Sequence, residues 1–422
     1  MVYQKIMMRT MLVGLAAIWL GFCVVEQGVA AELPAHMQEA ASQAASSTPC
    51  PEGQFMDLTA KSCRQLDQNF GFDQTLFEQN LGSQKFALPQ NQCTITDLQA
   101  LLDAVGPTGG VIQIPACTIR VSQRIFLPSN VIFQGAGVGK TVFQATADFD
   151  DTVMQVRNGS NVIIRDLTVD GAGSAHLLVS AWYADNVLIE HIEARNSNGS
   201  GIHFRYAKRI TIRYSESHHH KQWHGISSKD CFPNKNTVDD AQECSAEFLE
   251  NARNGDTEPG VLWSENYAVY SNNLHDNGDY GLDLHASSGE VAGNLVQDNV
   301  RGVKFPDAAH VWIHHNGIAG SSWWGMFFYN TVDIAERASH NIAFYANTIG
   351  QNGLVQARIE KPATNIYFID NTYTSFINVM RNQSAIYRCA DTQDESVFVY
   401  GTRFKEASPA ECKLSAIGKL FD

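Results

Sequence analysis

The chain is short of basic side chains. It carries 30 lysines and arginines against 44 aspartates and glutamates in 422 residues, a formal net charge of −14. A nucleic-acid partner needs a basic surface that neutralises its phosphates, so this balance argues against binding of DNA or RNA. It does not argue against a polyanionic substrate, because a local row of cations can reverse the sign of the field over one part of the surface.

Long apolar runs are also scarce. The first lies near the N-terminus, where two basic residues precede an apolar run, 11–25, and small residues follow. This pattern predicts a signal peptide over 1–31, cleaved near Ala30 or Ala31; the alternative is an uncleaved membrane anchor. No later stretch is long and apolar enough to span a bilayer. We therefore expect a secreted protein, extracellular or periplasmic, with no membrane association after cleavage.

The nine cysteines include no CxxC pair, which argues against a zinc site built on that spacing. Eight cysteines remain after cleavage, and an even count in a secreted chain indicates disulfides. Spacing alone leaves the connectivity open, but we expect local pairing because the cysteines fall into sequence neighbours. These neighbours are Cys50 and Cys63, Cys93 and Cys117, Cys231 and Cys244, and Cys389 and Cys412.

From Gly110 onward the chain consists of short β-rich runs with Asn at the turns and no helical pattern between them. Several runs begin at a Gly followed by an apolar residue, at intervals in the low twenties once an insertion, 231–262, is set aside. This period is typical of a parallel β-helix, whose coils stack because none can bury its apolar face alone. A propeller would need repeats about twice as long. The marker glycines are Gly201, Gly225, Gly281, Gly302, Gly325 and Gly353.

The chain is therefore predicted to be all-β, a single-stranded parallel β-helix with an N-terminal capping segment. Thr96 or Asp97 is expected to cap a short helix, 98–105, that ends at Gly106 and Pro107. The predicted parts are a signal peptide, 1–31; an N-terminal disulfide-containing extension, 32–92; the β-helix, 93–380, with the insertion 231–262; and a C-terminal cap, 381–422.

The alternation of side chains along a strand indicates which residues leave the core. After Gly281, we expect Leu282 and Leu284 to point inward, and Asp283 and His285 to point outward. Stacked coils would align such residues on one outer face, where fixed cations could hold carboxylates and aromatic rings could stack on sugars. The alternative is an ordinary solvated sheet face. The predicted row is His203, Arg205, Lys229, Asp283, His285, Lys304, Phe327 and Tyr329.

The centre of this row resembles a known family. Residues 280–285, Tyr-Gly-Leu-Asp-Leu-His, resemble the Tyr-Gly-x-Asp-Pro-His motif of mannuronan C5-epimerases, which are right-handed β-helix enzymes that act on alginate. The likeness includes the following coil and, in architecture, most of the repeat region. Leu284 replaces the family's proline, and Ala286 stands where an acidic residue is frequent. The family also has a charged active-site residue on the next coil, and Lys304 and Asp307 lie near that place.

The resemblance implies that Tyr280 and His285 serve as acid and base and that Asp283 supports the substrate carboxylate. Removal of the C5 proton of a uronate builds negative charge on the carboxylate, which a cation or an acid must neutralise. Epimerisation also needs one proton-transfer group on each face of the ring. We expect an anionic polysaccharide as partner, a monomer, no required cofactor and no metal among the site residues, with Ca²⁺ left open.

Two other functions remain open. An alginate lyase would share the first step and then expel the 4-linked sugar by β-elimination. A glycan-binding β-helix would have no catalytic activity. Loss of Tyr280 or His285 would abolish the activity of an enzyme, whereas a binding protein would tolerate either change. This difference separates the two classes.

Other motifs are interpreted structurally. The segment 135–141 resembles a phosphate loop but lacks its first glycine, so a β-helix turn is predicted. The histidine-rich segment 218–224 could bind a metal, although a solvated loop edge is favoured. Glycoside hydrolysis needs a pair of carboxylates. Asp279 and Asp283 are close in sequence, but no other acidic pair is predicted on adjacent coils. Trp323 and Trp324 could either wall a sugar subsite or pack against the coil.

Overall fold

The computed structural model describes the chain over 50–51, 53–67, 70–229, 264–306, 308–329, 339–359 and 363–373, and the backbone of short strands from 377 to 406. The predicted signal peptide, the insertion 231–262 and most of the predicted C-terminal cap lie outside the described residues. None of the helices within the described ranges is long and apolar enough to cross a membrane.

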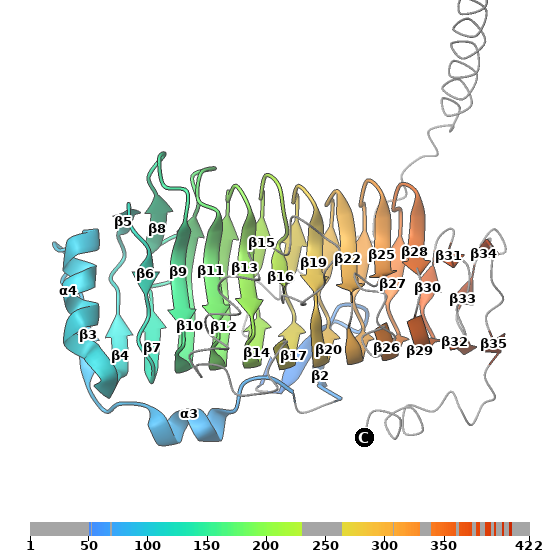
Figure 1. Ribbon diagram of the computed structural model, residues 1–422, viewed down its shortest axis with the longest axis horizontal. Helices are drawn as coiled ribbons and strands as arrows, with labels where there is room; N and C mark the ends of the chain where they lie inside the picture. The colour runs from blue at the N-terminus through green and yellow to red at the C-terminus, as the bar shows by residue number, and fades with distance from the viewer. Residues whose placement is uncertain are drawn as a thin grey trace, which may run out of the picture. The chain divides into compact units, whose positions relative to one another are not determined.

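The repeat region is the predicted right-handed parallel β-helix (Figure 1), in which the coils stack and contribute strands to three faces. The first face is an eleven-stranded sheet whose neighbouring strands pair in parallel. Its strands are β6 (Ile125–Phe126), β9 (Thr152–Arg157), β11 (Leu177–Trp182), β13 (Ser200–Arg205), β16 (Ile226–Ser228), β19 (Tyr280–Leu284), β22 (Arg301–Pro306), β25 (Trp324–Tyr329), β28 (Val355–Ile359), β31 (Ile377–Val379) and β34 (Val399–Tyr400).

The second face is a parallel stack that begins at the N-terminal end of the β-helix (Figure 1). Its strands are β3 (Lys85–Ala87), β4 (Gly110–Gln113), β7 (Val131–Gln134), β10 (Ser160–Asp170), β12 (Asp185–Arg195), β14 (Lys208–Arg213), β17 (Ser264–Tyr270), β20 (Ala286–Ala292), β23 (Ala309–His314), β26 (Ser339–Tyr345), β29 (Ala363–Ile369), β32 (Ala385–Cys389) and β35 (Lys405–Glu406).

The third face is made of shorter strands, and the C-terminal parts of β10 and β12 bend into it. Its other strands are β5 (Thr118–Val121), β8 (Val142–Ala145), β15 (Glu216–His218), β18 (Asn273–His275), β21 (Leu295–Gln297), β24 (Gly317–Ala319), β27 (Thr348–Gly350), β30 (Thr372–Tyr373) and β33 (Thr392–Gln393).

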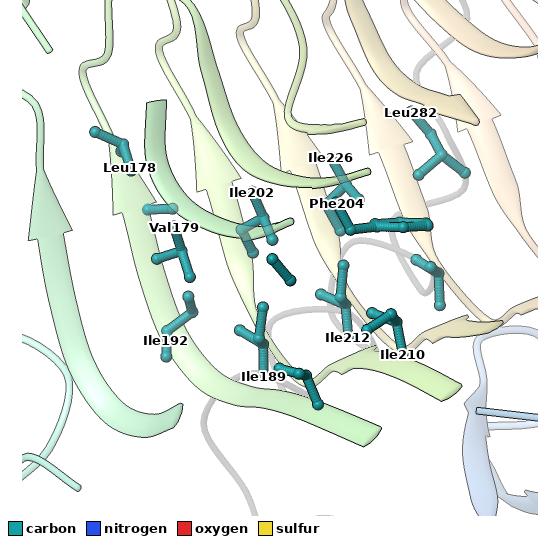
Figure 2. Close-up of a cluster of buried hydrophobic side chains, with 14 of the residues drawn as sticks. Leu178, Val179, Ile189, Ile192, Ile202, Phe204, Ile210, Ile212, Ile226 and Leu282 are labelled. Atoms are coloured by element: carbon teal, nitrogen blue, oxygen red, sulfur yellow. The ribbon is translucent and has the colours of Figure 1, made fainter. Parts of the chain in front are cut away.

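Inward-pointing side chains form a continuous apolar core between the three faces. Val179, Ile202, Ile226 and Leu282 occupy one register position in successive strands of the eleven-stranded sheet, and all four are fully buried. Figure 2 shows them beside residues from the facing strands. Because adjacent strands lie only about 4.8 Å apart, each inward side chain packs against its equivalents on neighbouring coils.

Asparagines at the turns form a ladder, in agreement with the sequence pattern. The Nδ2 of Asn272 donates to the Oδ1 of Asn294 at 2.9 Å, and that of Asn294 donates to Asn316 at 3.0 Å. The ladder continues from Asn316 to Asn347 and from there to Asn371. All five side chains are buried, so the ladder satisfies polar groups that water does not reach.

The predicted capping helix is present as α4 (Ile95–Val105), but it begins earlier than expected. Its N-cap is Thr94, not Thr96 or Asp97, because the Thr94 hydroxyl accepts the backbone N–H of Asp97 at 3.1 Å. The helix ends at Gly106, as predicted, where a φ of 52° favours glycine. Against the core, α4 buries Leu98, Leu102 and Val105. A short 3₁₀ helix, η1 (Gly106–Thr108), follows.

The N-terminal extension contains an antiparallel hairpin, β1 (Gln54–Asp57) and β2 (Ser62–Gln65), and a helix, α3 (Gln74–Asn80), that the sequence did not predict. The hairpin residue Phe55 packs against Tyr214 and Tyr270 on the outside of the second face. Figure 1 shows this segment, in blue, running along the β-helix.

Two of the predicted local disulfides are confirmed, Cys50–Cys63 and Cys93–Cys117. The first closes the β1–β2 hairpin, and the second joins the residue before Thr94 to the residue before β5. The other predicted neighbours, Cys231 with Cys244 and Cys389 with Cys412, fall outside the residues whose side chains the structure describes.

Gly353 does not occupy the marker position that the sequence assigned to it. Val303 pairs with Met326, and Met326 pairs with Ala357, so the place of the earlier marker glycines falls to Gln356. Gln356 is buried there, and its Oε1 accepts the Nδ2 of Asn352 at 2.7 Å. A side-chain amide therefore fills a space that the preceding coils leave to glycine.

Candidate active site

The register of the eleven-stranded sheet brings five outer-face residues into one row. His203 pairs with Ser227, and Ser227 pairs with Asp283. Asp283 in turn pairs with Lys304, and Lys304 pairs with Phe327. The structure therefore brings four of the predicted residues together, although neighbouring side chains leave His203, Asp283 and Phe327 at most 8% exposed.

The remaining predicted residues lie beside this row or beyond the described chain. Arg205 ends β13, and His285 directly follows β19, each two residues past a member of the row. Lys229 is exposed just after β16. Only the backbone of Tyr329 is described, and Asp307 lies outside the described residues.

Asp283 is the centre of an ion cluster. Its Oδ2 lies 3.2 Å from the Nζ of Lys304 and 3.2 Å from the Nε2 of His224. Its Oδ1 lies 3.4 Å from the Nε2 of His285, a contact without hydrogen-bond geometry. The four side chains come from three successive coils, and the parallel register places them together.

This cluster keeps Asp283 ionised. Burial by itself would raise the pKa of Asp283, but the charges of Lys304, His285 and His224 outweigh burial and hold the pKa well below its usual range. The site therefore presents a carboxylate, already neutralised by a lysine, at neutral pH.

His224 holds two parts of the site in place. Its Nδ1 accepts the backbone N–H of Tyr280 at 3.3 Å, so the ring proton of the neutral imidazole lies on Nε2, which faces Asp283. Burial lowers the pKa of His224, against the opposing effect of Asp283 and Asp279, and favours this neutral form. Because both ring nitrogens are engaged, His224 is suited to positioning rather than to proton transfer.

His285 has a different environment. Its Nδ1 is buried, and among the described residues it has no hydrogen-bond partner. The Oδ1 of Asp283 is in the same condition. Buried polar atoms are nearly always paired, so unpaired ones require an explanation, and a ligand or a proton-transfer role can supply it. His285 is therefore the imidazole of this cluster that is available to accept a proton.

Tyr280 is held in its protonated form. Burial and the nearby charge of Asp283 raise the pKa of its phenol far above the usual value, and the opposing effect of Arg301 is smaller. The Nζ of Lys304 and the guanidinium of Arg301 each lie 5.4 Å from the ring centre. A neutral phenol with cations beside it can donate a proton or a hydrogen bond to an anionic sugar.

Sequence reasoning missed several residues of the site. His224 and Arg301 each directly precede a marker glycine, as Tyr280 does, and Arg301 pairs with Tyr280. The residue before each glycine was thus a readable signal. Arg358 pairs with Phe327 and belongs to the same row. The sequence did not reveal this, because Gly353, which the spacing assigns as the marker glycine of that strand, does not hold the marker position.

Cations and aromatic rings extend on both sides of the Asp283 cluster. Toward the N-terminal coils, Trp182 lies between Arg157 and Arg205, whose guanidinium carbons are 5.8 Å and 5.6 Å from its ring centre. His203 lies next to them, and its Nδ1 contacts the hydroxyl of Ser227 at 2.9 Å. Burial and the charge of Arg205 depress the pKa of His203 well below its usual range, so it is neutral.

Toward the C-terminal coils, Trp324 lies 4.7 Å from the guanidinium of Arg358 and 5.3 Å from that of Arg301. Trp323 is 44% exposed and lies 4.7 Å from Arg301. Trp323 therefore presents an exposed ring beside a cation, whereas Trp324 packs between two guanidinium groups.

Among the described residues of this sheet face, cations outnumber acids even though the whole chain is acidic. Asp279 is paired with Arg301, and Asp283 with Lys304. Neither carboxylate is left to act as an independent acid in a hydrolytic pair. The basic side chains along the sheet are Arg157, Arg205, Lys229, Arg301, Lys304 and Arg358.

The segment 135–141 is confirmed as a turn, between β7 and β8. Thr141, in the place of a phosphate-loop Thr, is fully buried, and its hydroxyl accepts the backbone N–H of Ala136 at 2.8 Å. It also donates to the carbonyl of Pro115. A hydroxyl used in this way is not available to a nucleotide.

Comparison with known proteins supports the resemblance. No protein-family model matches the chain. Two curated relatives, the mannuronan C5-epimerases AlgE5 and AlgE2 of Azotobacter vinelandii, are each 28% identical over 222 residues. Each alignment covers 46% of this chain and 21% of the relative, so the chain matches about a fifth of the length of these relatives. The predicted likeness to mannuronan C5-epimerases is thereby confirmed at the level of sequence.

Two solved structures share the fold. The A-module of mannuronan C-5 epimerase AlgE4 from Azotobacter vinelandii superposes with a TM-score of 0.50 at 16% identity, covering 74% of this chain and 95% of the module. A family 28 exopolygalacturonase from Yersinia enterocolitica also has a TM-score of 0.50, at 10% identity, with coverages of 76% and 77%. At these identities the superpositions establish the β-helix architecture.

Proposed function

We propose that the protein is a polysaccharide epimerase that converts mannuronate to guluronate in alginate by removing and returning the proton at C5. The observation that carries the proposal is the Asp283 cluster. It combines an ionised carboxylate paired with a lysine, a phenol held protonated and an imidazole with an unpaired ring nitrogen. The likeness of the sequence to mannuronan C5-epimerases supports this choice.

In the proposed reaction, the basic surface first binds the substrate carboxylates, and Lys304, already beside Asp283, lies closest to the reacting uronate. His285 then accepts the C5 proton, and the electron pair of the broken C–H bond moves into the carboxylate. Lys304 and the phenol of Tyr280 neutralise the charge that develops there. The buried Nδ1 of His285, which has no hydrogen-bond partner among the described residues, is the atom that we propose accepts the proton.

Tyr280 then donates its phenolic proton to C5 from the opposite face of the ring, which inverts the configuration. The resulting phenolate regains a proton by way of solvent, and His285 releases the one that it accepted. One proton leaves and one returns, so the reaction is a net isomerisation. No step calls for a cofactor or for a change of oxidation state. We place the activity outside the cytoplasm, where the predicted signal peptide would deliver the chain.

The alternative enzyme is a lyase that uses the same first step. After proton removal by His285, the electron pair would expel the 4-linked sugar, and Tyr280 would protonate the departing oxygen. Epimerisation is favoured over elimination by the sequence relatives rather than by the geometry, which suits both reactions. A non-catalytic glycan-binding protein is the third candidate.

Incubation of polymannuronate with the protein in deuterated water distinguishes the three. We expect proton NMR to show new guluronate residues that carry deuterium at C5, without chain cleavage. Unsaturated chain ends that absorb in the ultraviolet, without guluronate, would replace the epimerase by the lyase. If neither product forms on any polyuronate, only the binding-protein candidate remains. A His285→Ala variant provides the inactive control.

A further inference from the structure

A second cluster of histidines and carboxylates lies on the third face of the β-helix, where the chain turns toward the strands of the candidate active site. One ring nitrogen from each of His218, His219 and His275 lies within 4.8 Å of the other two. His218 ends β15 and pairs with His275, which ends β18 on the next coil. The two rings are stacked, with centres 4.8 Å apart and planes only 6° apart.

Carboxylates hold the far sides of two of these rings. The Nε2 of His218 lies 3.3 Å from the Oε1 of Glu193, and the Nε2 of His275 lies 2.9 Å from the Oε1 of Glu216. In His218, this contact keeps the proton on Nε2 and directs the lone pair of Nδ1 away from the carboxylate. Histidines that ligate metals are usually oriented in this way.

The Nδ1 atoms of His218 and His219 meet on the opposite side. The two nitrogens are only 2.6 Å apart and share one hydrogen-bond proton, which a metal ion would replace. Next to them, the Oδ2 of Asp276 lies 2.7 Å from the Nδ1 of His275. Three imidazoles match the protein ligands of a zinc site with one open position, and a bound ion would take the place of Asp276 at the Nδ1 of His275.

We propose that His218, His219 and His275 bind a divalent transition-metal ion of the zinc class, with Glu193 and Glu216 orienting the rings of His218 and His275. Imidazole nitrogen selects zinc, copper or nickel over the oxygen-seeking ions Ca²⁺ and Mg²⁺. The site is distinct from the Asp283 cluster, where the Asp283 carboxylate forms an ion pair with the ammonium group of Lys304. The proposal departs from the favoured interpretation of 218–224 as a solvated loop edge, because the next coil supplies His275.

The ion would act as a staple between coils. β15 and β18 are neighbours in space, but the insertion 231–262 separates them in sequence. A bond between residues so far apart in the chain removes loop entropy from the unfolded state and stabilises the fold. His219 also begins the turn that leads to His224, so the ion fixes the start of the segment that positions Asp283.

The test uses the full mature chain without a histidine tag, stripped with EDTA and titrated with ZnCl₂ by calorimetry. We expect one ion per chain and a rise in melting temperature on binding. The test variant is His219→Asn, because His219 is exposed and has a φ of 58°, which asparagine tolerates. It should weaken zinc binding at least about 10-fold, since one of three nitrogen ligands is lost.

The matched control is His310→Asn, which changes a histidine of nearly the same φ, 57°, outside the cluster. It should bind zinc as the parent chain does. A second variant, His275→Gln, tests the ligand from the other coil, and the melting temperature without metal shows whether each variant is folded. Equal zinc affinity in His219→Asn, His275→Gln and the parent would overturn the proposal. So would saturation by Ca²⁺ at concentrations where Zn²⁺ does not bind.

Discussion

His224 and Asp283 belong to different coils, and the insertion separates them in sequence, yet the Nε2 of His224 lies 3.2 Å from the Oδ2 of Asp283. The same ring accepts the backbone N–H of Tyr280 through its Nδ1. One imidazole therefore sets the position of a carboxylate on one side and of the strand that carries the proposed acid on the other.

Replacement of His224 by alanine should lower kcat about 10-fold or more, because it removes a positioning contact from the reacting groups. It should also move the acid limb of the pH–rate profile to higher pH. The pKa of Asp283 is held low, so the ionised form is present above that pKa and is lost as the pH falls through it. Without His224 the pKa rises, and the loss begins at a higher pH.

His224→Gln is the conservative control, since its amide N–H can still reach Asp283. It should retain more activity and a smaller shift of the acid limb than His224→Ala. A reduced kcat in His224→Ala with an unmoved pH profile would show that the ring acts in some other way.

Tyr280→Phe and His285→Ala should each reduce the rate by about 10²-fold or more, which is the usual contribution of an acid or base in proton transfer. Asp283→Asn should be severely impaired as well. None of the three should unfold the protein, because these side chains lie outside the apolar core. Steady-state rates on polymannuronate, with melting curves for each variant, provide the check; full activity in either of the first two variants would exclude that residue as a proton-transfer group.

Lys229→Ala should mainly raise KM. The side chain is exposed, and an ion pair between an exposed lysine and a substrate carboxylate contributes on the order of 1 kcal/mol. The effect should diminish with added salt, which screens such pairs. A large fall in kcat at unchanged KM would instead place Lys229 in the chemistry.

Asn294→Ala should destabilise the β-helix. The side chain donates to Asn316 and accepts from Asn272, so its loss leaves buried polar groups without partners. Each such group costs about 1–3 kcal/mol. The free energy of unfolding should fall measurably in denaturant titrations, while Asn91→Ala, at an exposed site, should leave it unchanged. Equal stability of the two variants would mean that the ladder contributes nothing.

The mature chain should contain no free thiols. Two disulfides are present in the structure, and the four cysteines whose side chains are not described are predicted to pair locally, Cys231 with Cys244 and Cys389 with Cys412. Thiol titration of the denatured, unreduced protein should therefore detect about zero thiols per chain. Two or more would contradict the second set of pairings.

The fold and the main row of the site could be predicted because both depend on simple periodicities. The marker glycines fixed the coil length, and strand alternation then placed His203, Asp283 and Lys304 on one face. Alternation fails at Tyr280, which lies three residues before Asp283 and yet contacts the same lysine. The alternation pattern therefore did not identify the residues that hold the position of Tyr280 on other coils, such as Arg301.

Contacts across the insertion could not be predicted for another reason. The glycine spacing predicts that the coils resume after 231–262, but it does not show which side chains of the turns and of β15, β16, β18 and β19 contact each other across the insertion. The partnership of His224 with Asp283 and that of His218 with His275 depend on the register of these strands. Both required the three-dimensional arrangement of the coils.

The capping helix α4 affects whether the β-helix can associate end to end with other copies of the chain. A stack of parallel coils ends in a strand with unpaired amide and carbonyl groups, and such an edge is a template for adding another chain. Here the terminal strand of the second face, β3, is only three residues long and begins with a lysine. Beside it, α4 covers the apolar interior with Leu98, Leu102 and Val105. This end of the β-helix is thereby protected from fibre-like growth, and removal of α4 would open it to end-to-end polymerisation.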